Sequence, residues 1–347
     1  MSRLVTGVRS FSTAASSMLA GVTSARSAGH PSSFQVFRDV PQLRQLRRQL
    51  LRNDRSVGFV PTMGALHEGH LSLIREAARE NTDIFVSIFV NPTQFGVNED
   101  LSSYPRTWDS DVEKLEQLNE ELAKATAAGS DTPTGRISAI FAPTSKKLEG
   151  GSRPVFFRGV ATVCMKLFNA VTPDRVYFGQ KDIQQTVIIK RMVQDFLIGT
   201  EVRIVSTTRE PTGLALSSRN VYLGERRRAV GLTIYKALKA ADEAYRSGKT
   251  SREDILGAAR SVTKRVLAEQ EALSPTERAL FEADYISLAD PDTLDELDLV
   301  DRSKGAVLSA ALKMAPLEET KPGEDCGLGD GKVAVRLIDN IILQPQQ

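Results

Sequence analysis

The residues best suited to chemistry are two histidines in the stretch PTMGALHEGH, residues 61–70. The chain has only three histidines among 347 residues, yet His67 and His70 stand three positions apart. A short apolar run (VGFV) precedes the stretch and an amphipathic one (LSLIREAA) follows it, which predicts a strand that turns into a helix. Backbone N–H groups and the dipole at a helix start favour phosphate, and Gly69 lets the backbone approach a ligand closely. An imidazole N–H there can donate to a phosphoryl oxygen as charge develops.

Two other interpretations of the histidine pair stay open. A metal site would use both imidazoles as ligands, but no third or fourth ligand of the same type stands nearby. A helix-capping turn would need only two polar surface residues. We favour phosphate binding, because it uses both histidines and the glycine between them.

Two further segments carry groups that suit a nucleotide. In FGQKDIQQ (178–185), Lys181 can neutralise phosphate charge, and Asp182 can cap a helix or bind a nucleotide's sugar or base. In LALSSRN (214–220), Arg219 can hold a phosphate through two parallel hydrogen bonds. Each segment also suits an ordinary helix start or turn, so neither identifies a site by itself.

An acidic pair follows the sequence YPRT at the predicted start of another helix. Asp109 and Asp111 are the two residues. Acids in a first turn usually complement the helix dipole. A water-mediated role in holding Mg²⁺ is the alternative, and it makes Asp111 a candidate metal residue.

Alternating strands and helices must position these groups. Five short apolar runs without clean alternation predict strands covered on both faces, at Val57–Val60, Ile84–Phe89, Ile137–Phe141, Arg175–Phe178 and Val202–Val205. Helical patterns lie between them, at Leu71–Arg79, Asp109–Leu122, Val160–Phe168 and Ile183–Phe196. This alternation predicts an α/β fold with a doubly wound parallel sheet, whose ligand site lies at the carboxyl ends of the strands.

The pattern changes after about residue 207. Residues 34–207 form the predicted nucleotide-binding domain, and residues 208–347 a smaller α+β domain. We expect helices and strands in the second domain at Leu223–Ser247, Arg252–Glu269, Asp284–Leu288, Ala306–Ala311 and Val333–Leu337. Two polar stretches rich in Gly, Pro or Thr predict surface insertions at 123–136 and 315–332, around ATAAGSDTPTG and PLEETKPGEDCGLGDG.

Six motifs in a fixed order resemble one family. They are PTMGALHEGH, VSIFVNPTQF (86–95), YPRT (104–107), FGQKDIQQ, LALSSRN and RLIDN (336–340). The series is similar to the pantothenate synthetases, or pantoate–β-alanine ligases, and the His-x-Gly-His element is that of the nucleotidyltransferase superfamily. The resemblance runs from about Phe34 to Leu343, and it is specific because six separate motifs agree.

The resemblance implies an ATP-dependent ligase with a Rossmann-like domain. Pantoate and β-alanine would condense to pantothenate through a pantoyl-adenylate, releasing AMP and pyrophosphate, with ATP as a substrate and Mg²⁺ as a cofactor. The family resemblance also suggests a homodimer. Neither a nucleic acid nor a membrane is expected as a partner, because the body has no basic face and no apolar run of about 18 residues.

The resemblance also assigns site residues. The catalytic set is His67, His70, Lys181 and Arg219. The residues expected around ATP are Met63, Gly64, Ala65, Leu66, His67, Glu68, Gly69, His70, Gly179, Gln180, Lys181, Asp182, Leu216, Ser217, Ser218 and Arg219. Pantoate would bind at Asn91, Gln94 and Gln185, whose uncharged amides can hydrogen-bond a hydroxy acid without repelling its carboxylate.

The composition supports one large domain or two ordinary ones, and the cysteines indicate a reducing compartment. The apolar fraction is 41%, and the two cysteines do not make a disulfide framework. Residues 1–33 read as a transit-like or disordered tail, because arginines, Ser, Thr and Ala occur there and no acid precedes Asp39. Subtracting the four arginines up to residue 38 changes the formal charge of +2 to −2, so the basicity belongs to this end. A mitochondrial location is the expectation, with a cytoplasmic one as the alternative.

One junction departs from the family pattern. Relatives have a longer connection between the strand at 137–141 and the segment resembling LEGGSRP (148–154), where this chain has only TSKK. Val155 and Phe156 replace Gly-His, and Leu216 replaces the Met of many relatives, a mild apolar exchange. A real deletion and an incorrectly spliced gene model both explain the junction, and we favour the second. Such a chain should bind ATP yet turn over slowly, with weakened pantoate binding. A non-catalytic relative or another nucleotidyltransferase are the alternative functions.

Overall fold

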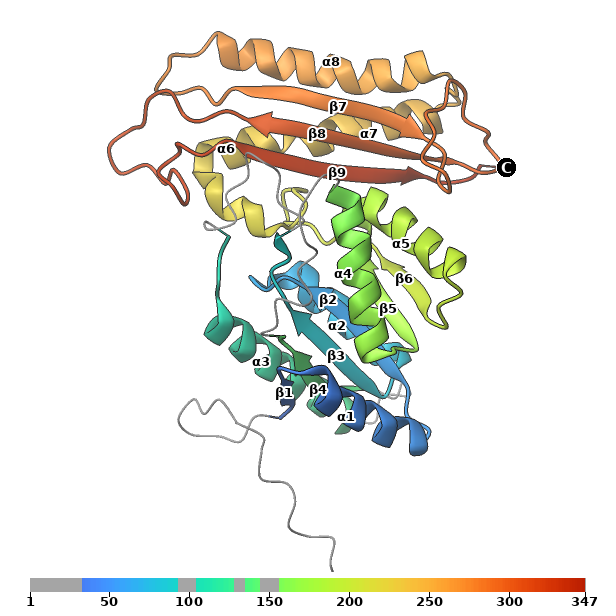
Figure 1. Ribbon diagram of the computed structural model, residues 1–347. Helices are drawn as coiled ribbons and strands as arrows, with labels where there is room; N and C mark the ends of the chain where they lie inside the picture. Colours follow the sequence, from blue (N-terminus) through green and yellow to red (C-terminus); the bar gives the residue numbers. More distant parts are fainter. Residues whose placement is uncertain (1–32, 93–103, 128–134, 144–155, 347) are drawn as a thin grey trace, which may run out of the picture.

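The computed structural model describes residues 33–92, 104–127, 135–143 and 156–346. It has two parts, an α/β domain and a smaller domain in which a three-stranded sheet lies against helices (Figure 1). Residues 1–32 of the predicted tail and residues 144–155 at the junction lie outside the described residues.

The first domain is built on a six-stranded parallel sheet. Its order is β1-β4-β3-β2-β5-β6, and every neighbouring pair is parallel. The strands are β1 (Gln35–Phe37), β2 (Val57–Thr62), β3 (Asp83–Ile88), β4 (Arg136–Phe141), β5 (Arg175–Gly179) and β6 (Glu201–Val205). The apolar runs do not alternate because helices cover both faces of the sheet. The predicted fold class and its five strands are confirmed.

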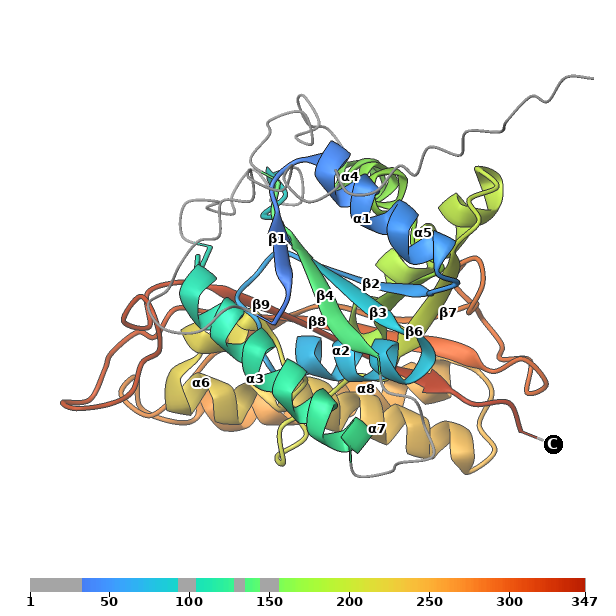
Figure 2. The ribbon, with the colours of Figure 1, turned by 90° about the horizontal axis from the view of Figure 1, so that it is seen from below.

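Helices pack on both faces (Figure 2). On one face lie α1 (Val40–Arg52), α4 (Phe156–Val171) and α5 (Ile183–Asp195), whose apolar side chains share a core with Phe59, Phe85 and Phe141. On the other face lie α2 (Glu68–Glu80) and α3 (Trp108–Ala127), which pack on Val60, Val86 and Ile140. Consecutive strand residues thus enter opposite cores.

Two parts of this domain differ from expectation. Neither β1 nor α1 is predicted, although Leu43, Arg47 and Leu50 form a buried stripe at helical spacing and Asp39 caps the helix. The insertion predicted at 123–136 begins too early, because α3 continues to Ala127. Helix propensity in KLEQLNEELAKATA carries the helix past the last buried leucine, Leu122.

The strand order fixes where a ligand can bind. β2 lies between β3 and β5, so the chain leaves β2 toward one side of the sheet and β5 lies on the other. This is the switch point of a doubly wound sheet, where a crevice opens at the carboxyl ends of the strands. The histidine segment follows β2, and FGQKDIQQ follows β5. Topology therefore brings these two motifs together.

The second domain is α+β, as predicted. Its sheet is antiparallel in the order β7 (Phe281–Ala289), β8 (Ala306–Met314), β9 (Val335–Leu343). Its core includes the apolar face of α7 (Thr233–Arg246) and residues of α8 (Arg252–Glu271). The single helix expected over 223–247 is two helices, because α6 (Gly224–Gly231) ends before Leu232 and α7 begins after it. Residues 331–334 are not part of β9, so the strand begins later than predicted.

The segment between β8 and β9 includes the predicted insertion at 315–332. Most of its side chains are exposed, but its backbone is attached to α6. Arg227 is fully buried and donates to the carbonyls of Val333, Cys326 and Ala315, at 2.6, 3.3 and 3.5 Å. Gly224 allows this approach, since a Cβ there would lie 2.4 Å from the backbone of Asp325. The segment is a docked connection rather than a free loop.

Two global expectations can be compared with the described residues. Both cysteines are free thiols, in agreement with a chain that has no disulfide framework. Among the described helices, none is long and apolar enough to cross a membrane.

Candidate active site

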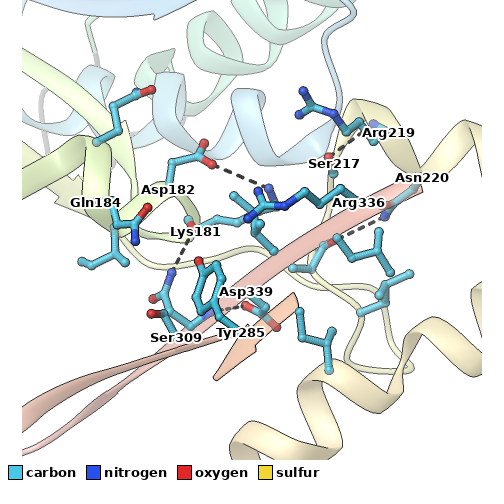
Figure 3. Close-up of a pocket in the computed structure, with 18 of the residues that line it drawn as sticks. Lys181, Asp182, Gln184, Ser217, Arg219, Asn220, Tyr285, Ser309, Arg336 and Asp339 are labelled. Atoms are coloured by element: carbon cyan, nitrogen blue, oxygen red, sulfur yellow. Dashed lines mark hydrogen bonds and ion pairs between the residues drawn. The ribbon is translucent and has the colours of Figure 1, made fainter. Parts of the chain in front are cut away.

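A cavity of about 220 Å³ opens at the carboxyl ends of β2 and β5. The histidine segment, the lysine turn after β5 and the loop at 206–219 all line it. A second cavity, of about 330 Å³, lies between the two domains and shares Lys181, Asp182, Gln185, Ser217 and Arg219 with the first. The close-up in Figure 3 shows this second cavity, with Lys181 and Asp182 facing residues of the C-terminal sheet.

The histidines cap helix α2. His67 is the N-cap residue, and its Nδ1 accepts from the N–H of Gly69 at 3.1 Å. Nδ1 of His70 accepts from the N–H of His67 at 3.4 Å, which completes a capping box. The capping interpretation is therefore correct as a description of this turn. The cap also explains why residue 69 is a glycine, because a Cβ there would lie 2.8 Å from the His67 ring.

These bonds determine which nitrogen of each ring carries a proton. Burial and the positive charges of Lys181 and Lys114 lower the pKa of His67 to about 4. Burial, His67 and the same lysines lower the pKa of His70 to about 3. Both imidazoles are neutral at pH 7, and because each Nδ1 accepts a hydrogen bond, each proton lies on Nε2. Both rings therefore offer an Nε2–H donor, with centroids 4.2 Å apart.

Helix α3 holds the turn that leads to these histidines. The backbone is left-handed at Gly64 (φ 86°) and Ala65 (φ 50°), so two consecutive N–H groups point the same way. The buried carboxylate of Asp111 accepts from the N–H of Ala65 at 2.9 Å and from that of Leu66 at 2.7 Å. Lys114, one turn further along α3, donates to the carbonyl of Leu66 at 2.7 Å. Both polar backbone groups of Leu66 are thus bound from one helix.

This arrangement bears on the predicted magnesium residue. The Asp111 carboxylate also accepts from the Thr107 hydroxyl at 3.1 Å, and only 1% of the residue is exposed. Its companion Asp109 is exposed. No group of three or more His, Cys, Asp or Glu that could hold a metal ion occurs among the described residues. A direct bond from Asp111 to magnesium would compete with its hydrogen bonds to the backbone of residues 65–66, and the water-mediated role stays a prediction.

The lysine turn joins β5 to α5. Residues Gln180–Asp182 form one turn of 3-10 helix, and Lys181 is mostly buried, 3.8 Å from the Asp182 carboxylate. Gln185 lies one helical turn further along and also lines the cavity. The backbone of this turn is bound from the other domain, because the side-chain amide of Asn340 donates to the carbonyls of Gln180 and Lys181.

The third wall is the loop between the domains. A hydrogen bond joins the two sides of this loop, in which the N–H of Leu216 donates to the carbonyl of Thr208 at 3.0 Å. The Thr208 hydroxyl lies 2.9 Å from the hydroxyl of Ser72 on α2. Ser217 then caps the 3-10 helix Ser218–Tyr222 through the N–H of Arg219. The loop thus begins a helical turn beside the start of α2. Residues of both motifs line the same cavity.

Most of the predicted residues lie together. The cavity at the strand ends is lined by Met63, His67, Gly69, His70, Asn91, Gly179, Lys181, Asp182, Gln185, Leu216, Ser217, Ser218 and Arg219. Five predicted ATP residues do not line it. Gly64, Ala65 and Leu66 face Asp111, Glu68 pairs with Arg75 outside, and Gln180 contacts Asn340. Gln94 lies outside the described residues.

Several lining residues were not among the predicted ones. Tyr104 contacts Ser218, and burial raises the pKa of its phenol. The Thr207 hydroxyl is buried without a hydrogen-bond partner among the described residues, so a bound ligand could use it. Helix α4 adds an apolar wall of Val160, Val163, Cys164 and Leu167. Tyr104 stands in the motif YPRT and could have been found. The wall could not, because its apolar pattern also predicts an ordinary core helix.

Comparison with known sequences gives consistent results. The family model described as pantoate-beta-alanine ligase matches residues 35–342. A pantothenate synthetase from Chloroflexus aurantiacus is 44% identical over 289 residues, which cover 83% of this chain and 92% of that protein. A pantoate–β-alanine ligase from Saccharomyces cerevisiae is 40% identical over 328 residues, which cover 89% of this chain and 100% of that protein.

Solved structures with similar folds agree with the sequence comparison. A crystal structure of pantothenate synthetase from Thermus thermophilus superimposes with a TM-score of 0.66 at 33% identity, over 89% of this chain and 99% of that one. A pantoate-beta-alanine ligase from Francisella tularensis, complexed with beta-gamma ATP and beta-alanine, has a TM-score of 0.60 at 28% identity, over 90% and 98% of the two chains.

Proposed function

Because this chain belongs to the pantoate–β-alanine ligase family, we propose that it condenses pantoate with β-alanine in an ATP-dependent reaction. The observation that carries the proposal is the pair of neutral imidazoles, each with its N–H on Nε2, beside Lys181 and Arg219 in one cavity. Neutral donors and fixed cations suit a transition state in which negative charge spreads over phosphate oxygens.

The reaction has two steps. A pantoate carboxylate oxygen attacks the α-phosphorus of ATP, and the bond to the bridging oxygen breaks, which releases pyrophosphate. The amine of β-alanine then attacks the acyl carbon of pantoyl-adenylate and loses a proton, and AMP leaves. Neither step needs a covalent nucleophile on the protein, so positioning and charge stabilisation are its contribution.

We assign the residue roles from side-chain chemistry and the family resemblance. His67 and His70 donate to oxygens of the α and β phosphates, while Lys181 and Arg219 offset the phosphate charge. Asn91, Gln94 and Gln185 bind pantoate through their amides. The wall of α4 excludes water from the adenylate, since it presents only apolar groups and a thiol.

Isotope exchange tests this proposal. With pantoate present and β-alanine absent, labelled pyrophosphate should exchange into ATP, and adding β-alanine should release AMP and pantothenate in equal amounts. Exchange that needs another acid would assign the chain to a different nucleotidyltransferase, and ATP binding without exchange would make it a non-catalytic relative. Gln185→Ala should raise the KM for pantoate more than the KM for ATP.

The short junction at 144–147 bears on the rate. We expect ATP binding through the motifs described above, but slow turnover and weak pantoate binding. Inserting a connection of the length expected from the family pattern should then lower the KM for pantoate and leave ATP binding unchanged. Equal kinetics for the two chains, with tight pantoate binding in both, would show that the longer connection is dispensable.

Three further features remain proposals. Magnesium would accompany the phosphates of ATP, and we assign it no protein ligand; omitting it with a chelator should abolish exchange. A homodimer is inferred from the family resemblance, and sedimentation of the purified chain tests it. A mitochondrial location rests on the arginine-rich, acid-poor residues 1–33, and fusing them to a fluorescent protein tests the address.

A further inference from the structure

The C-terminal domain reaches the lysine turn through one buried amide. Asn340 on β9 is 1% exposed. Its Nδ2 donates to the carbonyl oxygens of Gln180 and Lys181, each at 2.9 Å, and its Oδ1 accepts from Nε2 of Gln180 at 3.0 Å. Both donors and the acceptor of this amide therefore bind two consecutive residues of the other domain.

The lysine turn has little local support. Gly179 has no side chain to cap the turn, and Asp182, the N-cap of α5, makes no capping hydrogen bond. The Lys181 side chain lines the cavity between the two domains (Figure 3). The carbonyl of the same residue accepts a hydrogen bond from Asn340. The position of the ammonium thus depends on a bond made to its own backbone.

Asn340 is itself held in place. Its N–H donates to Oδ1 of Asp339 at 2.8 Å, and it pairs with Ser309 in the β8–β9 ladder. The Asp339 carboxylate is fully buried and receives two hydrogen bonds from Arg209, at 2.5 and 2.9 Å, while that guanidinium stacks on Tyr235 at 4.1 Å. Since Arg209 belongs to the loop between the domains, the ion pair fixes β9 against this loop.

We propose that Asn340 is a positioning residue for the adenylation step. It holds the carbonyls of Gln180 and Lys181 so that the Lys181 ammonium lies at the phosphates, and it makes this position depend on the docking of the C-terminal sheet. The inference rests on the role proposed for Lys181. Asn340 touches no reacting group and acts only through that residue.

A matched pair of isosteric substitutions tests the inference. Asn340→Asp keeps an acceptor for Gln180 but loses both donors and places a carboxylate against two carbonyl oxygens. Asn119 on α3 is the control, because it is also buried, donates to Ser33 and to the Ile137 carbonyl, and accepts from the Ile137 N–H. Asn119→Asp therefore breaks the same number of bonds away from the site.

Direct titration with ATP is the first measurement, because it does not require turnover. Asn340→Asp should weaken ATP binding about 10-fold and lower pyrophosphate exchange about 10- to 100-fold, as expected when a misplaced group serves the transition state. Asn119→Asp should change both by less than about 2-fold. Equal effects of the two substitutions would overturn the inference. If the wild-type chain binds ATP but does not exchange pyrophosphate, the proposed function fails. The effect of Asn340→Asp on ATP binding then tests the positioning role by itself.

A double substitution tests whether Asn340 acts through the lysine. In a Lys181→Ala background, Asn340→Asp should reduce ATP binding by no more than about 2-fold further, because the group it positions is gone. The same 10-fold loss in both backgrounds would show a different role. If Asn340→Asp does not fold, Asn340→Ser keeps one donor and should show a smaller loss in the wild-type background with none in Lys181→Ala; losses that are equal in both backgrounds would overturn the inference.

Discussion

The two turns that flank the cavity at the strand ends are held in different ways. The turn before His67 is bound within its own domain by Asp111 and Lys114, which stand 45 to 48 positions along the chain. The turn that carries Lys181 is bound by Asn340, about 160 positions away in the other domain. The histidine half of the site is therefore complete in the α/β domain, whereas the lysine half depends on how the two domains dock.

The bonds also differ in strength. Asp111 and Lys114 are ionised, and charge-assisted hydrogen bonds are roughly twice as strong as neutral ones. Asn340 offers a neutral amide to neutral carbonyls. A change in how the two domains dock would therefore alter the lysine turn, while the histidine turn would keep its shape.

The largest effect should come from the histidine side itself. His70→Ala should lower adenylation about 10²- to 10⁴-fold, because it removes an Nε2–H donor aimed at charge that develops in the transition state. Pyrophosphate exchange measures the loss, and circular dichroism checks the fold. His70→Asn separates the donor from the cap, since its carbonyl oxygen can still accept from the N–H of His67. Near-normal exchange in His70→Ala would remove His70 from the catalytic set.

A smaller loss is expected when the histidine turn is loosened. Asp111→Asn replaces one acceptor oxygen by a donor, which leaves the N–H of Ala65 or of Leu66 without a partner and should lower exchange about 10-fold. Asp109→Asn in the same helix turn is the control and should change little, because Asp109 is exposed. Neither substitution should change the magnesium concentration that gives half-maximal exchange. A clear shift for Asp111→Asn would restore its predicted role at the metal.

Hydrogen exchange can test whether the two turns are independent. Asp111→Asn should speed exchange of the Ala65 and Leu66 amides, which donate to that carboxylate. Asn340→Asp should leave those two amides unchanged and speed exchange around residues 180–183. The amide signals assigned by NMR measure both effects. Faster exchange at both turns in either variant would mean that the site is one cooperative unit.

The smallest effect should be that of pH on activity. Because the pKa values of His67 and His70 are about 4 and about 3, adenylation should show no imidazole titration between pH 6 and 8. Stability behaves differently. Between pH 6.5 and 4 the histidines bind protons in the unfolded chain but not in the folded one. The free energy of unfolding should therefore decrease as the pH is lowered from 6.5 to 4. Urea unfolding across that range measures it, and replacing both histidines should reduce the slope.

The parts of the fold that the sequence predicts are those with local signals. The strands β2 to β6 are apolar runs bounded by breaks, and β2 to β5 are largely buried between the helices of the two faces. No helix is predicted at α1, because arginines recur through the segment even though its leucines recur at helical spacing. The break between α6 and α7 is not predicted either, since Leu232 looks like a helix interior residue and its backbone stays in the helical region (φ −59°, ψ −16°).

The same distinction between local signals and tertiary contacts applies to the candidate site. The sequence by itself determined the reactive groups and their places at helix starts: His67 and His70 after β2, Lys181 after β5, and Arg219 in the loop between the domains. Only the tertiary structure decided what holds them, namely Asp111 against the backbone of residues 65–66 and Asn340 against that of residues 180–181. The physical reason is that helix starts and strand ends are local patterns, whereas these hydrogen bonds join residues from 45 to 160 positions apart. Their partners become neighbours only when the sheet and the second domain have folded.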